Sequence, residues 1–491
     1  MTELPAGWAN SDFGTIADIK LGKMLDKARN TGTPTPYLRN INVRWGCFDL
    51  GDLFNVPLSE EERKLFAIHD GDLLVCEGGE PGRCAVWRDG PTDIKYQKAL
   101  HRVRFLEEVS PEFAAQFLFH LSLQRDLEQH FTGTTIKHLP RTAFQRVSIP
   151  LPPLAEQRRI VEKLDWLSAH SQSARDHLAR VATLATRAKQ ATLAAAFRGE
   201  LTADWREGAE EATWSEEAIV EIERLRADYE KKRRGSRLSS DSGIMIDDLG
   251  TLPHGWFRSH LAELVEMQVG HAFKSKWYVE DEGPLLVRGA NVAPGRIDWT
   301  DAKRLDPDLA PDYQQFRLSS GDIVVAMDRP LISTGLKVAV VDDETAGALL
   351  VQRVARIVAG PFSSTPFIWH LLNSEIFLQH AIGRATGGDL PHISGNDILM
   401  TPVPLPSPTE QQEIVDRIET AFARIDRMAA EAARAAGLLD RLDERLLAKA
   451  FHGELVPQDP SDEPASELLA RIRQARAAAP KPKRGRRKKS A

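Results

Sequence analysis

The sequence predicts an α+β protein with an internal pseudo-two-fold repeat: two globular, strand-rich mixed α/β domains separated by two long antiparallel coiled-coil helices. Two observations support this fold class. The segment VSIPLPPLAEQRRIV at 147–161 returns as TPVPLPSPTEQQEIV at 401–415, and a run of apolar heptads follows each copy. A repeat period of about 250 residues is far longer than that of solenoid repeats, so the copies are domain-sized.

Shorter motifs recur with nearly the same offset. Leu4-Pro5-x-Gly7-Trp8 returns at 252–256, and Phe197-x-Gly199-Glu200-Leu201 returns at 451–455. The pattern predicts six segments: a first globular domain at 1–152, a first helix at 153–203, a linker with a charged helix at 204–250, a second globular domain at 251–406, a second helix at 407–456 and a flexible basic tail at 457–491.

Within the domains, short apolar runs bounded by Gly, Pro and Asp predict strands. In the first copy they lie at 15–21, 37–43, 72–76, 84–87 and 99–105, and a helix begins at Pro111. In the second copy they lie at 285–287, 322–326, 337–341 and 351–358, and a helix runs through Phe367. In the linker, residues 215–232 predict a charged amphipathic helix.

We call the repeated proline-rich segments at 147–161 and 401–415 the straps. Each strap is followed by apolar or small residues spaced alternately by four and three, which form a stripe that we call a seam. The first seam occupies positions 160, 164, 167, 171, 174, 178, 181, 185, 188, 192 and 195, and the second occupies 414, 418, 421, 425, 428, 432, 435, 439, 442 and 446. Small residues in one seam and larger ones in the other favour close packing of the two helices. We expect them to pair antiparallel, with the domains at opposite ends. The alternative is two separate surface helices.

Composition indicates a globular protein without a membrane segment. The 491 residues are 42% hydrophobic and carry a formal charge of −6, and no long apolar run occurs, so we expect a cytoplasmic protein. The acidic balance means that any binding to nucleic acid depends on localised basic loops or on a partner. Cys47, Cys76 and Cys84 form no CxxC pair, which favours small buried thiols over a zinc site.

Catalytic motifs are absent from the sequence. It lacks a GxxxxGK[ST] phosphate loop, HExxH, GxSxG and the Asn- or Asp-Pro-Pro-aromatic tetrapeptide of amino-methyltransferases. We therefore expect a non-catalytic protein, with no catalytic residues and no metal site.

A further doubled motif is Arg39-x-x-Asn42-x-x-x-Gly46-x-x-Asp49, which returns as Arg288-x-x-Asn291-x-x-x-Gly295-x-x-Asp298. We interpret it as a turn scaffold, in which Asn and Asp bond their own backbone and Gly adopts a positive φ. A phosphate anchor through the arginine is the alternative. His138 and His392 also occupy equivalent positions, and we expect a structural role for them.

Residues that read a nucleic acid should lie in loops where the copies diverge, because Arg and Lys bond guanine whereas Gln and Asn bond adenine. In the first domain the candidates are Lys20, Lys23, Lys27, Arg29, Arg39, Asn42, Arg44, Arg83, Lys95, Gln97, Lys98 and Lys137. In the second domain they are Lys274, Lys276, Arg288, Asn291, Arg296, Arg329, Lys337, Gln352, Arg353 and His392. A solvated surface charge is the alternative for each.

The repeated strap with its Glu-Gln pair, the LPxGW opening, the RxxN…G strand and the AAFRGEL helix end resemble the specificity subunit of type I restriction-modification systems. The resemblance covers residues 4–455. It implies two target recognition domains that each read half of a bipartite site in double-stranded DNA, and two helices that act as spacer and dock. It also implies partners: methyltransferase (M) subunits, which bind S-adenosylmethionine, and restriction (R) subunits. This chain itself is expected to bind no cofactor.

Two other classes of function stay open from the sequence. One is a self-sufficient nuclease or methyltransferase, against which the missing motifs argue. The other is a stand-alone DNA-binding or protein-interaction scaffold that works without modification partners.

Overall fold

The computed structural model describes residues 4–25, 30–88, 90, 93–106, 109–208, 214–234, 246–333, 335–384 and 392–478. The chain divides into two compact units. Unit 1 comprises residues 1–178 together with 433–491, and unit 2 comprises residues 179–432. Both long helices therefore contribute one part to each unit, and the division falls inside the helices rather than at the domain boundaries that the sequence suggests.

Unit 1 is built on a four-stranded antiparallel sheet with the order β2-β8-β5-β6. Strand β5 is buried along its whole length. The strands and helices of unit 1 before α5 are β1 Ala9–Asp12, α1 Phe13–Ile16, β2 Ala17–Leu21, β3 Thr33–Leu38, β4 Phe54–Leu58, α2 Glu60–Leu65, β5 Leu73–Cys76, β6 Cys84–Val86, β7 Lys95–Tyr96, β8 Leu100–Phe105, α3 Pro111–Leu123, α4 Arg141–Phe144 and β9 Ser148–Leu151. The strand predicted at 37–43 ends earlier, because the RxxN motif turns the chain after Leu38.

Unit 2 repeats this architecture with a four-stranded antiparallel sheet in the order β11-β22-β17-β20. Its elements before the second strap are α6 Ala203–Gly208, α7 Glu216–Arg234, β10 Phe257–His260, β11 Val265–Val269, β12 Tyr278–Val279, β13 Leu286–Val287, β14 Val292–Ala293, β15 Arg296–Ile297, β16 Arg304–Leu305, β17 Ile323–Ala326, β18 Leu331–Ile332, β19 Gly335–Leu336, β20 Val338–Val340, β21 Leu349–Leu350, β22 Val354–Ala359, α8 Thr365–Leu372, α9 Glu375–Arg384 and α10 Gly395–Leu399. The identical strand order confirms the structural repeat.

Each proline-rich strap forms a strand that joins its domain to a long helix. In unit 1, β9 pairs antiparallel with β1, and in unit 2, β23 (Pro402–Leu405) pairs antiparallel with β10. Ile149 and Leu151 are fully buried, as are Val403 and Leu405. Because alternate strap residues enter the core, the start of each long helix is fixed to its own domain.

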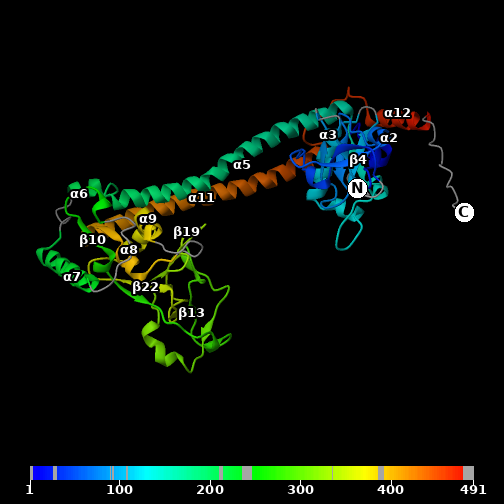
Figure 1. Cartoon of the computed structure of the whole chain (residues 1–491). Coiled ribbons are helices and arrows are strands. Elements are labelled where there is room, and N and C mark those ends of the chain that lie inside the picture. The colour runs from blue at the N-terminus through cyan, green and yellow to red at the C-terminus, as the bar shows by residue number, and fades with distance from the viewer. Residues whose placement is uncertain are drawn as a thin grey trace. The chain divides into compact units, whose positions relative to one another are not determined.

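The two long helices, α5 (Leu154–Phe197) and α11 (Pro408–Phe451), have 44 residues each and pair in both units (Figure 1). In unit 1, the hydroxyl of Ser171 donates to Asp443 at 2.8 Å, and Arg175 forms ion pairs with Asp440 and Asp443. In unit 2, Lys189 lies 2.6 Å from Asp426. Partner numbers fall as the α5 numbers rise, so the antiparallel pairing is confirmed and separate surface helices are excluded.

The predicted seams are largely the buried stripes of the two helices. Of the first seam only Ala188 is exposed. In α11, however, Met428 and Leu442 are 52% and 46% exposed. These two positions of the predicted seam are wrong, and the neighbouring residues 429 and 443 are partly buried instead.

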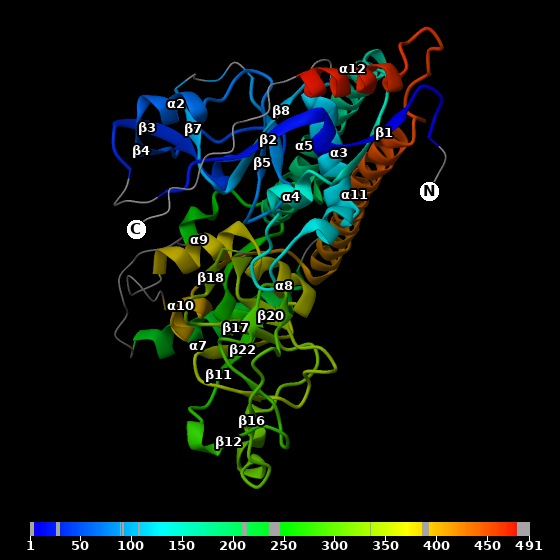
Figure 2. The same cartoon turned by 90° about the vertical axis from the view of Figure 1, so that its right-hand side faces the viewer.

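Short helices outside the domains complete the two cores. Helix α7 packs on unit 2 through Ile222, which is 3% exposed, and the charged helix expected in the linker is confirmed. Helix α12 (Ala465–Ala478) packs on unit 1 through Leu468, Leu469 and Ile472 (Figure 2). The prediction of a flexible tail from residue 457 is therefore wrong for residues 465–478, because apolar residues on one face of this segment are buried. The basic residues from 479 onward lie outside the described part of the chain.

The end of each long helix meets the LPxGW opening of the domain in the same unit. Gly199, at φ +75°, lies so close to Pro253 that a Cβ would clash, and Gly453, at φ +73°, lies equally close to Pro5. Glycine is needed here for both its left-handed backbone and its lack of a side chain. The conserved spacing of the two motifs thus has a direct structural cause.

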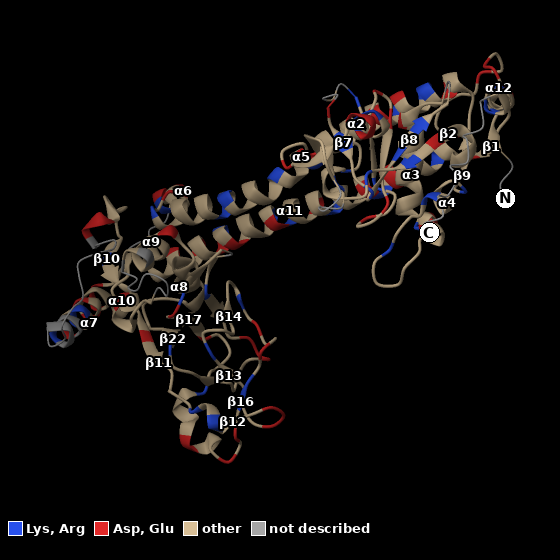
Figure 3. Cartoon of the chain, turned by 45° about the vertical axis from the view of Figure 1, so that its right-hand side comes forward, with Lys and Arg blue, Asp and Glu red and all other residues tan. Residues whose placement is uncertain are grey.

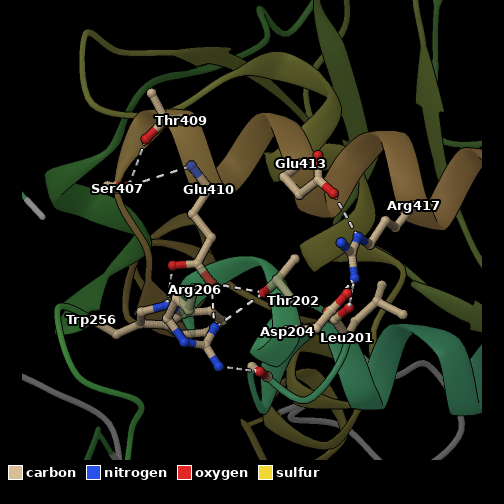
Figure 4. A network of polar contacts seen from close by, with 11 residues as sticks. Leu201, Thr202, Asp204, Arg206, Trp256, Ser407, Thr409, Glu410, Glu413 and Arg417 are labelled. Atoms are coloured by element: carbon tan, nitrogen blue, oxygen red, sulfur yellow. Dashed lines mark hydrogen bonds and ion pairs between the residues drawn. The ribbon is translucent and has the colours of Figure 1, made fainter. Parts of the chain in front are cut away.

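A buried glutamate of each strap binds the tryptophan of the LPxGW opening in the same unit. In unit 1 the indole of Trp8 donates to Glu156 at 3.0 Å. In unit 2 the indole of Trp256 donates to Glu410 at 2.7 Å, and Glu410 also accepts from Thr202 and from Arg206 (Figure 4). Among the described contacts this ion pair exists only in unit 2, because Pro460 in unit 1 stands at the position equivalent to Arg206.

Among the residues that the structure describes, no helix combines the length and apolarity that a bilayer crossing requires. Cys76 and Cys84 are buried, as expected, and burial raises the pKa of Cys76 to about 11. Cys47 is exposed, so the prediction of a buried thiol is wrong there, because the residue lies in the surface turn of the RxxN motif.

Candidate nucleic-acid interface

The RxxN motif forms the same hydrogen-bonded turn in both domains. The amide of Asn42 donates to the carbonyl oxygens of Asp49 and Asp52, each at 3.0 Å, while its side-chain oxygen accepts from the backbone N–H of Arg39. Asn291 makes the equivalent bonds to Asp298, Asp301 and Arg288. Both asparagines are 1% exposed. Their assignment as DNA contacts is therefore wrong, since burial and the turn's own hydrogen bonds occupy their polar atoms.

The arginines of this motif are held by carboxylates of the same turn. The guanidinium of Arg39 donates to Asp52 at 2.6 Å and lies 3.8 Å from the centre of the Phe54 ring. The guanidinium of Arg288 donates to Asp301 at 2.8 Å and lowers the pKa of that carboxyl. Gly46 and Gly295 have φ of 74° and 75°. These contacts confirm the turn scaffold, and the phosphate anchor has no support in them.

In unit 2, six of the predicted DNA-binding residues line one cavity of about 780 Å³. They come from different strands and turns that the sheet brings together. The cavity is lined by Arg288, Gly289, Ala290, Asp328, Arg329, Lys337, Val351, Gln352, Arg353 and His392. Four of the side chains are cationic, which suits a polyanion, and Gln352 and Asp328 add an amide and a carboxylate that can discriminate bases.

Within this cavity, the exposed side chain of Arg353 contacts an acid and an imidazole. Nη1 of Arg353 lies 3.1 Å from Nδ1 of His392 and 3.5 Å from Oδ1 of Asp328. Nδ1 of His392 lies 2.7 Å from the same Asp328 oxygen. The three side chains form one cluster, so the guanidinium is restrained while more than half of the Arg353 side chain is accessible to solvent.

Unit 1 has the same backbone hydrogen bonds at the positions equivalent to the cavity lining, and we call this shared arrangement the backbone frame. The N–H of Lys98 donates to the carbonyl of Lys23 at 2.9 Å, as the N–H of Gln352 does to that of His271 at 2.8 Å. The N–H of Glu77 donates to Ala99, as that of Met327 does to Arg353. These bonds make Lys98 equivalent to Gln352, and Ala99 equivalent to Arg353.

The side chains on this common frame differ sharply between the domains. Gly78 pairs with His138 in the way that Asp328 pairs with His392, which also makes Gly79 equivalent to Arg329. Arg83 donates to the carbonyl of Asn40 at 2.9 Å, and Lys337 makes the corresponding bond to Gly289. The first domain thus presents glycines and alanine where the second presents Asp328, Arg329 and Arg353.

The two equivalent histidines have a structural role in part. Nδ1 of His138 lies 3.1 Å from a carboxylate oxygen of Glu77, and the backbone of His138 pairs with Thr132. His392 has Asp328 as its acid. In each domain the histidine contacts an acid just after the central strand, Glu77 after β5 or Asp328 after β17.

The other predicted residues are more scattered. Lys20, Lys137 and Arg296 are exposed in ion pairs with Asp18, Glu128 and Asp298, and Lys23 is bound to Glu62, whose pKa it lowers. Exposed residues also include Arg44, Lys98, Lys274 and Lys276, while Gln97 is half-buried. Lys27 and Arg29 lie outside the described residues.

Lys95 is only 4% exposed, and burial lowers its pKa. Its assignment as a DNA contact is wrong because the strand β7 turns it toward the interior. Sequence reasoning also missed the equivalence of Arg83 and Lys337, whose offset of 254 differs from the 249 of the RxxN motif. The strands that follow these residues, β6 and β20, have the same offset of 254, and this offset could have revealed the equivalence.

Comparisons with known proteins agree with this architecture. Residues 5–180 match the family model of the type I restriction modification DNA specificity domain. The EcoAI specificity subunit of Escherichia coli is 29% identical, over 85% of this chain and 78% of that protein. The EcoKI specificity subunit of Escherichia coli K12 is 24% identical over 99% of both chains.

Solved structures share the fold. The HsdS subunit from Thermoanaerobacter tengcongensis superposes with a TM-score of 0.56 at 19% identity, covering 92% of this chain and 98% of that chain. A chain from a structure of a type I R-M system superposes with a TM-score of 0.60 at 18% identity, covering 93% of this chain and all of the other. Fold and sequence together define a DNA-recognition protein. Residues 5–180 match the type I restriction modification DNA specificity domain, and over most of its length the chain is similar to specificity subunits of type I restriction-modification systems.

Proposed function

We propose that this chain is the non-catalytic subunit that directs a type I methyltransferase and nuclease complex to a bipartite DNA target, with each domain reading one half-site. The observation that carries the proposal is the common backbone frame of the two domains with different side chains at the equivalent positions. A shared frame lets both domains approach duplex DNA in the same manner, and divergent side chains give each its own base preference.

The paired helices serve as the spacer between the two half-sites in this proposal, and they also dock the partners. Each of the 44-residue helices is about 66 Å long at 1.5 Å per residue. Figure 3 shows acidic and basic residues along both of them. Exposed apolar side chains among these charges are candidates for partner contacts: Trp166 and Leu438 in unit 1, and Leu184 and Met428 in unit 2. Phe197 and Val415 of the same two helices are buried in the core of unit 2 and are not candidates for such contacts.

The partners in the proposal are methyltransferase subunits, which bind S-adenosylmethionine and carry out the transfer, and restriction subunits. This chain supplies no catalytic residue and binds no cofactor. Because the formal charge of the chain is −6, binding to DNA is expected to be weak until a partner adds cationic surface.

The test is expression of the chain together with the methyltransferase encoded beside it, followed by mapping of methylated adenines in the host genome. We expect one motif with two specific halves and a fixed gap. Replacement of residues 4–150 by the first domain of another specificity subunit should change one half only. If the pair methylates no motif, or if the replacement changes both halves, the proposal is wrong.

A further inference from the structure

Two arginines of the second-domain cavity adopt a backbone conformation that side chains rarely tolerate. Arg329 has φ 45° and Arg353 has φ 67°. Among the described residues, only Arg125 also combines a side chain with a left-handed φ. The left-handed region is disfavoured for residues with a Cβ, and such outliers concentrate at binding sites, where the surrounding structure holds them in place.

The first domain shows what the same frame carries when these arginines are absent. Gly79, at the position equivalent to Arg329, has φ 85°, so the frame itself requires a left-handed residue. Glycine satisfies this requirement without strain. Ala99, at the position of Arg353, is not among the described residues with a left-handed φ, so this backbone conformation of Arg353 belongs to the second domain alone. The second domain therefore has an arginine where glycine fits better, and packing offers no compensation because the Arg329 side chain is exposed.

The surroundings of Arg353 orient its guanidinium without covering it. Asp328 and His392 lie within 3.5 Å of Nη1, while the side chain stays 54% exposed. In the first domain the position of Asp328 is Gly78, so the acid that restrains the arginine is missing together with the arginine itself. An acid behind a guanidinium and open space before it are what a residue needs to present its planar fork to a ligand.

We propose that Arg329 and Arg353 are the specificity-determining residues of the second domain, and that each recognises a guanine of its half-site in the major groove. This inference rests on the proposed function. A guanidinium fork matches the O6 and N7 acceptors of guanine and distinguishes this base from the other three. Gln352, which also lines the cavity, contributes an amide that matches adenine.

The experiment uses the full chain with its methyltransferase partner and the variants Arg329→Gly and Arg353→Ala. Arg329→Gly installs the residue that the first domain carries with a left-handed φ, whereas Arg353→Ala installs a residue that the first domain carries without one, so circular dichroism and melting temperature establish that both variants fold. Arg353→Lys keeps the charge but removes the fork. Arg224→Ala, an exposed residue of α7, is the control for loss of one positive charge.

The readouts are the genome-wide methylation motif and binding to duplexes in which single guanines of each half-site are replaced. We expect Arg329→Gly and Arg353→Ala each to lose the preference for one guanine in a single half-site, by between about 5-fold and about 150-fold, and Arg353→Lys to keep part of this preference. The other half-site should be unchanged, and Arg224→Ala should methylate the wild-type motif.

The inference is overturned if the variants keep the wild-type motif, or if they weaken binding to all duplexes equally, which is the behaviour of a phosphate contact. Retained discrimination in Arg353→Lys together with its loss in Arg353→Ala supports the inference, because lysine also bonds guanine. Failure of the proposed function is a separate outcome, because then the wild-type pair itself shows no bipartite motif.

Discussion

Two equivalent buried glutamates differ in the partners that neutralise them. Glu410 is fully buried and binds Arg206, Thr202 and Trp256. Glu156 is 1% exposed and binds only the Trp8 indole, and its second carboxylate oxygen has no hydrogen-bond partner among the described residues. The same substitution to glutamine should therefore have opposite consequences in the two units.

In unit 2, Glu410→Gln removes the charge that neutralises Arg206 and places an amide N–H₂ against either the indole donor or the Thr202 and Arg206 donors. Breaking one partner of a buried ion pair costs about 3–5 kcal/mol. In unit 1, Glu156→Gln keeps the oxygen that accepts from Trp8 and replaces an unsatisfied carboxylate oxygen with a neutral group. Since a neutral amide is less costly to bury than a carboxylate, this change should be neutral or stabilising.

The assay is hydrogen exchange of the full chain followed by mass spectrometry, because peptides from β1 and β9 report on unit 1 and peptides from β10 and β23 report on unit 2. A loss of about 3 kcal/mol raises the exchange rate of cooperatively protected amides by about 150-fold. We expect this increase in unit 2 of Glu410→Gln alone, and unchanged or slower exchange in Glu156→Gln.

Equal destabilisation by both variants would show that the Arg206 ion pair is irrelevant and that the indole bond to the charged carboxylate determines stability. Unaltered exchange in Glu410→Gln would contradict the expected loss of stability in unit 2. In either case the difference in partners would have no energetic consequence.

Three further predictions concern the stability of the two units. Ile472→Ala should destabilise unit 1 by about 2–5 kcal/mol, because it removes a fully buried side chain. The matched variant Ile222→Ala should destabilise unit 2 alone. Urea unfolding followed by hydrogen exchange of peptides from each unit distinguishes the two variants. Asn42→Ala should cost about 1–3 kcal/mol, because the Asp49 carbonyl loses its side-chain donor while the Asp52 carbonyl keeps only Arg39. The urea midpoint measures this loss, and a stability equal to wild type would disprove the scaffold role. Burial raises the pKa of Glu156, so its stabilising contribution is present below the unfolded pKa and is lost as pH rises through the folded pKa. The urea midpoint of Glu156→Gln should accordingly fall less than that of the wild type over this pH range, and parallel pH profiles would refute the assignment.

The repeat made the fold predictable, because every motif seen twice had to occupy a position available in both domains. The seam phase in α11 was less predictable. From Ile425 onward the positions 425, 432, 439 and 446 keep the heptad spacing, but the second buried position of each heptad lies one residue later than predicted, at 429, 436 and 443. Met428 and Leu442 therefore lie outside the seam, although their heptad positions placed them inside it.

The candidate interface was predictable in location but not residue by residue. Charge and loop position selected Arg329, Gln352 and Arg353, which the structure brings together in one cavity. The same reasoning selected Asn42 and Lys95, which are buried, because a local pattern does not show toward which side of a turn or strand the long-range sheet pairing directs a side chain. The helix of the C-terminal segment was missed because its apolar face is short and its partner surface lies more than 400 residues earlier in the chain.

The contribution of α12 to the first core has a consequence for biosynthesis. Unit 2 is a single continuous stretch of chain, residues 179–432, whereas unit 1 requires segments from both termini. The amino-terminal domain emerges from the ribosome first, yet it acquires its last packing helix only when translation is nearly complete, so the carboxyl-terminal domain can reach its final packing earlier. An unfinished chain would thus hold a mature second domain beside a first domain with an uncovered apolar face, and premature termination before residue 465 should leave a product prone to aggregation.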